Sequence, residues 1–231
     1  GILQFIEQYR NLGYLPEAMF NFITLLGWSP VGEEEIFSPD QLIDLVDENR
    51  LSTSPAAFDA KKLEWINNTY VKQAPLEKVV ELALPHLKAA GRVSENPSAA
   101  EMEWVTKLVS LYHEQVSYGA EVVEVSELFF RDELHIDEAA KAELANETGP
   151  VVIKAMREQL ENLDEADFTA ENIKPLTKAV QKATGVKGRQ LFMPIRIAVS
   201  GQMHGPELPS VIEVLGKEKA INHIDQVLNL I

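Results

Sequence analysis

The spacing of the apolar residues is the feature that most constrains this chain, because they recur every three or four positions over most of its 231 residues. Met102, Val105, Val109, Tyr112 and Val116 are spaced 3, 4, 3 and 4 residues apart, which places them on one face of a helix. Strands would require apolar and polar residues to alternate with a period of two, and convincing alternation of that kind is scarce. The sequence therefore predicts an all-α fold.

Helix start and stop signals divide this pattern into separate helices. Ser38 and Ser98 are each followed three residues later by Gln or Glu, which is the capping box that opens a helix. The acidic run over residues 164–167 predicts a subdomain boundary. Proline marks first turns and glycine marks helix ends, so we expect helices over residues 16–28, 39–49, 54–70, 76–90, 99–118, 122–130, 136–147, 151–163, 170–183, 190–199, 208–215 and 218–230.

The composition excludes several classes of protein. Hydrophobic residues make up 45% of the chain and charged residues 25%, as in ordinary globular domains. There is no cysteine, so disulfides and thiolate metal sites are excluded and a cytosolic location is the default expectation. No stretch has the pattern of a signal peptide or the length of a membrane span. We expect a soluble, cytoplasmic protein with no membrane partner, and Gly1 in place of an initiator Met indicates a piece of a longer protein.

Motifs for catalysis and cofactor binding are also missing. The sequence has no phosphate-binding Gly-x-x-x-x-Gly-Lys loop, no dinucleotide-binding Gly-x-Gly-x-x-Gly and no nucleophile elbow. No acid, base and nucleophile set converges, which disfavours a compact all-α enzyme. We expect no catalytic residue, metal or cofactor in this chain. The histidines are not spaced as metal ligands; they are His86, His113, His135, His204 and His223.

Positive charge is concentrated in one segment of an acidic chain. The chain has 21 Lys and Arg against 36 Asp and Glu, a net charge of -15. The segment over residues 172–206, called the basic segment below, holds six of the basic residues and no acidic one. Such segregation predicts a local cationic surface that binds a polyanion, most obviously nucleic acid. The alternative is an acidic adaptor that binds basic proteins, but such an adaptor has no need of this segment.

The first five cations of the basic segment suit phosphate contacts. On one helix, Lys174, Lys178 and Lys182 recur at i, i+4 and i+8 and form a cationic ridge. Lys187 and Arg189 follow in a glycine-rich turn, where backbone amides can also approach a phosphate. The alternative for the three lysines is an ordinary solvated helix face, and the sequence favours the two interpretations about equally.

Arg196, the sixth cation, lies in the apolar run Phe192-Met193-Pro194-Ile195-Arg196. An arginine flanked by such side chains can stack on an unpaired base and hydrogen-bond its edge, which is how single-stranded RNA is usually recognised. The alternative for Arg196 is a buried or half-buried ion pair that closes the subdomain.

Three blocks of the sequence carry a resemblance to a known family. Residues 12–28, Leu-Gly-Tyr-Leu-Pro-Glu-Ala-Met-Phe-Asn-Phe-Ile-Thr-Leu-Leu-Gly-Trp, closely resemble bacterial glutamyl-tRNA synthetases. So do residues 54–59, Ser-Pro-Ala-Ala-Phe-Asp, with Lys62, Leu63, Trp65 and Asn67. Leu-Phe-Met-Pro-Ile-Arg at 191–196, followed by Gly201 and Gly-Pro-Glu-Leu at 205–208, looks like the anticodon-reading segment of that family. The resemblance covers essentially the whole chain and is of the Bacillus type.

The resemblance implies a class I ligase that joins glutamate to its tRNA with ATP and Mg. The family's two catalytic signatures, a His-x-Gly-His motif and a Lys-x-Ser-Lys-type loop, are missing here. The resemblance therefore implies a C-terminal fragment without the catalytic domain, which binds tRNA and catalyses nothing. It would comprise a stem-contact region over residues 1–72 and two helical anticodon-binding subdomains over residues 73–166 and 167–231. The implied partner is glutamate tRNA and not DNA, and the implied state is a monomer.

The same resemblance assigns roles to single residues of the anticodon-reading segment. Arg196 falls on the family's anticodon-contacting arginine. Its neighbours Met193, Gly205, Pro206 and Leu208 fall on positions that pack around flipped anticodon bases. Met193 replaces a polar residue of some relatives and Gly205 removes a hydroxyl, which argues against direct hydrogen bonds from these two positions.

Gln115 aligns with a position that is arginine in relatives that are strict for glutamate tRNA. We expect Gln115 on the flank of a helix, beside Leu108 and Leu111 and half turned to solvent. Because an arginine and a neutral amide treat the third anticodon base differently, the hypothesis is that the enzyme also accepts glutamine tRNA. The alternative is a surface amide without such a role.

The block over residues 58–65 allows two interpretations. Phe58, Leu63 and Trp65 are expected in the core. For Lys62 the sequence leaves two roles open: an i, i+3 ion pair with Asp59 worth roughly a few tenths of a kcal/mol, or a contact with the tRNA backbone.

Overall fold

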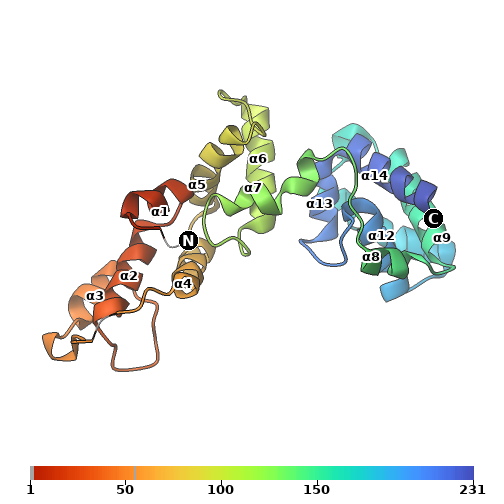
Figure 1. Cartoon of the computed structure of the whole chain (residues 1–231). Coiled ribbons are helices and arrows are strands. Elements are labelled where there is room, and N and C mark those ends of the chain that lie inside the picture. Colours follow the sequence, from red (N-terminus) through yellow and green to blue (C-terminus); the bar gives the residue numbers. More distant parts are fainter. Residues whose placement is uncertain (1–2, 55) are drawn as a thin grey trace. The chain divides into compact units, whose positions relative to one another are not determined.

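The computed structural model describes residues 3–54 and 56–231. Within these ranges the regular structure is helical, and the β pairing amounts to one isolated bridge between Trp28 and Leu51 (Figure 1). The all-α class predicted from the apolar spacing is therefore confirmed. The chain divides into two compact units, unit 1 (Gly1–Ser126) and unit 2 (Glu127–Ile231), which are described separately. None of the helices in the described ranges is both long and apolar enough to cross a bilayer.

Unit 1 consists of short helices joined by tight turns. α2 packs against α3 and α4, and α5, α6 and α7 pack against one another. These helices run from red to green in Figure 1. Their bounds are α1 (Ile6–Leu12), α2 (Pro16–Gly27), α3 (Pro39–Leu45), α4 (Ala60–Gln73), α5 (Leu76–Ala89), α6 (Ala99–Tyr112) and α7 (Glu121–Val125), with short 3₁₀ turns at Glu48–Arg50 and, at the start of unit 2, Glu127–Phe130.

The predicted N-terminal caps form at two helices of unit 1. The Ser38 side chain accepts a hydrogen bond from the backbone N–H of Gln41 at 3.2 Å, and the Gln41 side chain accepts one from the Ser38 N–H at 2.8 Å. This reciprocal box opens α3 as predicted. At α6, Ser98 caps the backbone N–H of Glu101, but the Glu101 carboxylate bonds Ser94 and leaves the box half formed.

Two buried asparagines join the loops of unit 1 to its helices. The Asn67 side chain, on α4, accepts a hydrogen bond from the backbone N–H of Leu15 at 2.9 Å and donates one to the carbonyl of Ser117. The Asn21 side chain, on α2, accepts one from the backbone N–H of Phe37 at 2.8 Å. Both asparagines are 0% exposed. They satisfy backbone groups that would otherwise be buried without a partner, which is costly.

The helix predicted over residues 54–70 begins later than expected. Pro55 lies outside the described residues, and α4 begins after Asp59. The Asp59 carboxylate accepts hydrogen bonds from two backbone N–H groups of the first turn, at 3.0 and 3.1 Å, so Asp59 is the N-cap. The ion pair with Lys62, one of the two roles left open, is not found, because the Lys62 ammonium pairs with Glu35 instead.

The core predicted for the same block is confirmed in part. Leu63 is fully buried, and Phe58 is partly buried and packs edge-on against Phe22. The prediction for Trp65 is wrong, because this side chain is 49% exposed. Two residues along an α-helix correspond to a turn of about 200°, so Leu63 and Trp65 point to opposite sides of α4.

α6 ends at Tyr112, earlier than the predicted end near residue 118. Gly119, which was expected to end that helix, instead permits a close crossing of chain segments. Its N–H donates to the carbonyl of Gly13 at 3.3 Å, and a Cβ at Gly119 would overlap the carbonyl of Leu82 on α5. Val116, in the segment between, stays buried.

Unit 2 is built around α12, in which seven of 12 residues are buried. α12 packs against α8, α9, α11, α13 and α14, and α9 also packs against α11 and α14. The bounds are α8 (Glu138–Leu144), α9 (Gly149–Asn162), α10 (Ala170–Ile173), α11 (Leu176–Thr184), α12 (Arg189–Ser200), α13 (Leu208–Leu215) and α14 (Lys217–Leu230), with a 3₁₀ turn at Glu165–Asp167.

The acidic run over residues 164–167 lies inside unit 2 and not between units. α9, which precedes the run, buries Val152, Ile153, Met156 and Leu160 and packs against helices that all follow it. The helices that cover this apolar face all follow the acidic run, so the compact unit continues through the run. The structure divides the chain between Ser126 and Glu127 instead.

His223, on α14, is a titratable group in the core of unit 2. It is 1% exposed, and its Nδ1 lies 2.8 Å from the carbonyl oxygen of Val199, so Nδ1 carries the proton. Nε2 is buried and has no hydrogen-bond partner among the described residues. Burial lowers the pKa of His223, the hydrogen bond to Val199 opposes this shift, and the charge of Lys219 adds to it. Protonation would place a charged N–H in the core without an acceptor.

Unit 2 should therefore lose stability as the pH falls below about 6.5, the pKa of an unfolded histidine. In that window the unfolded chain takes up a proton that folded His223 refuses, so the free energy of unfolding falls by at most about 1.4 kcal/mol per pH unit. Thermal unfolding at pH 7.5 to 5.5 measures this, with His223→Gln as the non-titrating control. Parallel pH profiles of the two proteins would contradict the prediction.

Candidate nucleic-acid interface

The basic segment lies in unit 2 and begins with two helices where one was predicted. The chain is interrupted between α10 and α11 at Lys174 and Pro175, because proline has no N–H to donate to the preceding turn. The prediction that the three lysines form a ridge on one continuous helix is therefore wrong. Lys178 and Lys182 remain one turn apart on α11 and are both exposed, whereas Lys174 lies before that helix.

Folding brings acidic residues to two cations of the basic segment. The Arg189 guanidinium forms a two-pronged ion pair with Glu143 of α8, with Nε–Oε1 and Nη2–Oε2 distances of 2.9 and 3.1 Å. The hydrogen bond from Arg189 lowers the pKa of the Glu143 carboxyl. Lys174 lies 3.5 Å from a carboxylate oxygen of Glu207. Neither acid belongs to the basic segment. The segment has no acidic residue in its sequence, but in the structure two acidic side chains from outside it lie beside its cations.

Three other lysines of the segment remain open to solvent. Lys178, Lys182 and Lys187 are exposed and form no ion pair with the described residues. Exposed lysines with free ammonium groups suit phosphate contact, and an exposed helix face has the same appearance. The two interpretations left open by the sequence therefore remain open for these side chains.

Arg196 is a half-buried residue of α12, and its Nη1 donates a hydrogen bond to the carbonyl oxygen of Pro206 at 3.1 Å. Burial lowers the pKa of Arg196. The ion pair considered as its alternative role is not found among the described residues; a backbone carbonyl takes that place. The Pro206 carbonyl thus orients the guanidinium of Arg196, and the other N–H groups of the guanidinium form no hydrogen bond with the described residues.

The residues around Arg196 come from the preceding turn of α12 and from the loop before α13. Met193, one turn earlier on α12, is partly buried. Gly205 has a φ of 154°, and a Cβ built on it would lie 3.5 Å from Nη1 of Arg196. Leu208 begins α13 and is only 7% exposed, so its side chain belongs to the core. The structure thus brings Arg196, Gly205 and Pro206 together.

Gln115 lies in unit 1, whereas the basic segment lies in unit 2. The prediction that it lies on a helix flank is wrong, because α6 ends at Tyr112 and Gln115 lies in the turn that follows. Its backbone carbonyl accepts a hydrogen bond from the Asn68 side chain at 3.3 Å. The Gln115 side chain is exposed.

Glu143 and Glu207 are the members of this surface that sequence reasoning missed. Glu207 is the residue that directly follows the basic segment, and this position in the sequence is only a weak indication of its contact with Lys174. Glu143 lies 46 residues before Arg189, in a surface helix with many similar carboxylates. Nothing in its local sequence distinguishes it as the partner of Arg189.

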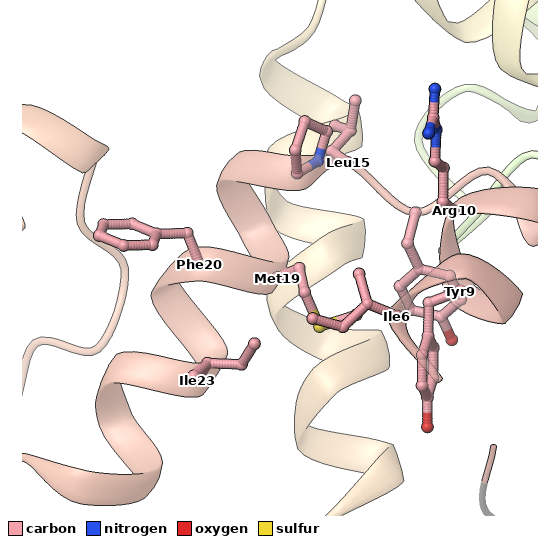
Figure 2. Close-up of a pocket in the computed structure, with 9 residues that line it drawn as sticks. Ile6, Tyr9, Arg10, Leu15, Met19, Phe20 and Ile23 are labelled. Carbon is pink, nitrogen blue, oxygen red and sulfur yellow. The ribbon is translucent and has the colours of Figure 1, made fainter. Parts of the chain in front are cut away.

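Two further features of the surface bear on chemistry. In the described ranges, no group of three His, Cys, Asp or Glu is placed to hold a metal ion. In unit 1 an apolar groove of about 330 Å³ lies between α1 and α2 (Figure 2). Arg10 is the charged side chain that lines this groove. The groove therefore lacks the cluster of cations expected of an RNA site.

The chain matches two family models. Residues 78–228 match the anticodon binding domain, and residues 1–65 match the catalytic domain of class I tRNA synthetases (E and Q). The segment expected to contact the tRNA stem therefore resembles part of a catalytic domain.

Individual relatives are named glutamate–tRNA ligases. The chain is 60% identical to that of Bacillus subtilis over 227 residues, which are 98% of this chain and 47% of the relative. It is 61% identical to that of Listeria innocua, over 97% of this chain and 46% of the relative. A crystal structure of the glutamate tRNA ligase from Elizabethkingia meningosepticum superposes with a TM-score of 0.79 at 29% identity, covering 96% of this chain and 42% of that one.

The chain thus spans about half the length of the curated relatives that it matches. The names of these relatives confirm the family resemblance inferred from the sequence. The anticodon-binding model covers well over half of the chain, including the whole of unit 2 up to residue 228. On this ground, the chain belongs to the anticodon-binding domain family found in glutamate–tRNA ligases.

Proposed function

We propose that this chain is the tRNA-binding portion of a glutamate–tRNA ligase and that residues 73–231 bind the anticodon, with Arg196 in unit 2 and Gln115 in unit 1. The observation that carries the proposal is the placement of Arg196. A guanidinium that is half-buried and oriented by the Pro206 carbonyl offers planar donors at a defined position. The family match over residues 78–228 and the names of the relatives support the same function.

Within this proposal Arg196 recognises a base, and the open lysines bind the backbone. Recognition of an unpaired base needs donors fixed in direction and an apolar surface for stacking, which Arg196 and the partly buried Met193 supply. Backbone phosphates need only positive charge within reach, which Lys178, Lys182 and Lys187 supply. Arg189 and Lys174 contribute less, because a phosphate must first displace Glu143 or Glu207.

The reaction itself is assigned to the rest of the ligase. The family's two catalytic signatures are missing from this sequence, so we propose that ATP and Mg are bound by the rest of the ligase. We propose that residues 1–72 contact the tRNA stem, and that the protein acts as a cytoplasmic monomer. The chain alone is expected to bind tRNA without charging it.

We also propose that Gln115 lets the ligase accept glutamine tRNA as well as glutamate tRNA. The exposure of Gln115 supports this, since its side chain is open to a ligand. A neutral amide can donate and accept hydrogen bonds, whereas an arginine only donates, so the amide tolerates more than one base.

Replacing Lys178 and Lys182 together by Gln should weaken binding of a glutamate tRNA transcript and flatten its salt dependence. If both bind phosphates, the slope of log K against log salt should fall by about 1.4 to 1.8. The control is Lys141→Gln with Lys154→Gln, which removes two exposed lysines of unit 2 outside the basic segment. An equal change in both double variants would show that only net charge matters.

Arg196→Ala should weaken binding of glutamate tRNA by about 1–3 kcal/mol, as expected for a residue that hydrogen-bonds a base edge. Arg196→Lys keeps the charge but loses the planar fork, so this variant should bind glutamate tRNA nearly as weakly as Arg196→Ala. Filter binding with glutamate tRNA and with a transcript of altered anticodon measures both variants. The same loss for every anticodon would assign Arg196 to the backbone or to folding, and thermal unfolding separates these two cases.

The intact ligase should charge both glutamate and glutamine tRNA, and Gln115→Arg should reduce charging of glutamine tRNA more than that of glutamate tRNA. Aminoacylation assays with the two purified tRNAs measure this. If the wild-type ligase rejects glutamine tRNA, Gln115 has no such role.

A further inference from the structure

Phe192 is an exposed aromatic side chain on α12, a helix that is otherwise mostly buried. Seven of the 12 residues of α12 are buried, whereas Phe192 is 51% exposed. Among the exposed large hydrophobic side chains that the structure describes in unit 2, it is the one aromatic residue. Its ring contacts no other described ring. A single exposed apolar side chain is common on protein surfaces, so the neighbours of Phe192 decide what it can bind.

The neighbours of Phe192 along the exposed side of α12 are cations. Arg189 precedes it by three residues and Arg196 follows it by four. Residues at these spacings are adjacent on a helix surface, with Cβ atoms about 5–6 Å apart. The exposed side of α12 therefore presents one aromatic ring with an arginine on either side of it along the helix.

Both guanidiniums are held by partners other than the ring. Arg189 forms its two-pronged ion pair with Glu143, and Nη1 of Arg196 donates to the Pro206 carbonyl oxygen at 3.1 Å. Because Glu143 neutralises Arg189, Arg196 supplies the unbalanced positive charge beside Phe192. The ring is thus open to a ligand next to a charged group that is already fixed in direction.

This combination fits an unpaired nucleobase. Every base has a π-face that stacks on an aromatic ring, and a guanidinium beside the ring can hydrogen-bond the base edge. The basic segment, which includes Phe192, has six Lys or Arg and no acidic residue, so it attracts the phosphates that accompany a base. An apolar protein segment would also cover Phe192, but it would bury N–H groups of Arg196 without acceptors, which is costly.

We infer that Phe192 is a base-stacking residue of unit 2, on which an unpaired base of the anticodon loop lies beside Arg196. The inference rests on the proposed function, because it requires RNA at Arg196. It goes beyond that function by assigning to Phe192 a contact that depends on the face of a base and not on charge. A second copy of this chain is the competing occupant of the ring.

The test removes the ring and the base separately and together. Phe192→Leu keeps an apolar side chain without a π-face. Filter binding uses glutamate tRNA, intact or with an abasic nucleotide at each position of the anticodon loop in turn. Phe192→Leu should weaken binding of intact tRNA about fivefold or more. It should weaken binding of the tRNA that lacks the stacked base less than about twofold, because the ring then has nothing to stack on.

The matched control is Val151→Ala, because Val151 is also 51% exposed and lies in unit 2 outside the basic segment. It should leave binding of every tRNA unchanged.

Two further readouts distinguish stacking from charge. The slope of log K against log salt should be the same for Phe192→Leu and the wild type, because no phosphate contact is lost. Phe192→Tyr keeps the ring, so it should bind intact tRNA within about twofold of the wild type. A smaller salt slope for Phe192→Leu, or binding by Phe192→Tyr as weak as that by Phe192→Leu, overturns the inference.

The remaining outcomes separate the inference from the proposed function. If Arg196→Ala weakens binding and Phe192→Leu does not, the inference fails and the function stands. Equal weakening by Phe192→Leu for the intact tRNA and for every abasic tRNA also overturns the inference, because the ring then touches no base of the loop. Binding that is insensitive to both variants and to the anticodon sequence counts against the function as well. A dimer in sedimentation that Phe192→Leu abolishes assigns the ring to a second copy and overturns the inference.

Discussion

The burial of α12 is the constraint on which the proposed RNA-binding surface of unit 2 depends. Seven of its 12 residues are buried, and α8, α9, α11, α13 and α14 pack around it. Because both ends of a buried helix are fixed by its neighbours, Arg189 at its start and Arg196 in its last two turns have defined positions. The Pro206 carbonyl then orients Arg196. A rigid core thus presents a charged group that a flexible surface loop would not hold in place.

The electrostatics of the surface follow from packing as much as from composition. Packing of α8 against α12 brings Glu143 to Arg189, and the loop before α13 brings Glu207 to Lys174. Exposed pairs of this kind contribute roughly 0–1 kcal/mol to stability, so they are weak obstacles to a phosphate. They do, however, divide the basic segment into cations that already have a partner and lysines that have no ion pair with the residues that the structure describes.

Unit 1 follows a different principle, because part of its apolar surface remains uncovered. The buried amides of Asn21 and Asn67 hold its loops against α2 and α4, so its inner side is satisfied by contacts within the chain. Its outer side carries Phe20 and Ile23 in solvent. A soluble domain rarely leaves such a face open, which distinguishes unit 1 from the largely covered unit 2 and relates it to the partial catalytic-domain match.

By itself the sequence determined the helical class, most helix positions and the caps of α3 and α6, because apolar spacing and capping are local properties of a few neighbouring residues. It also located the basic segment and Arg196. Only the tertiary structure decided that Trp65 is exposed, that Arg189 pairs with a carboxylate 46 residues away, and that the unit boundary precedes α8. These depend on which helix faces meet, and contacts between residues distant in the chain leave no periodic trace in one sequence.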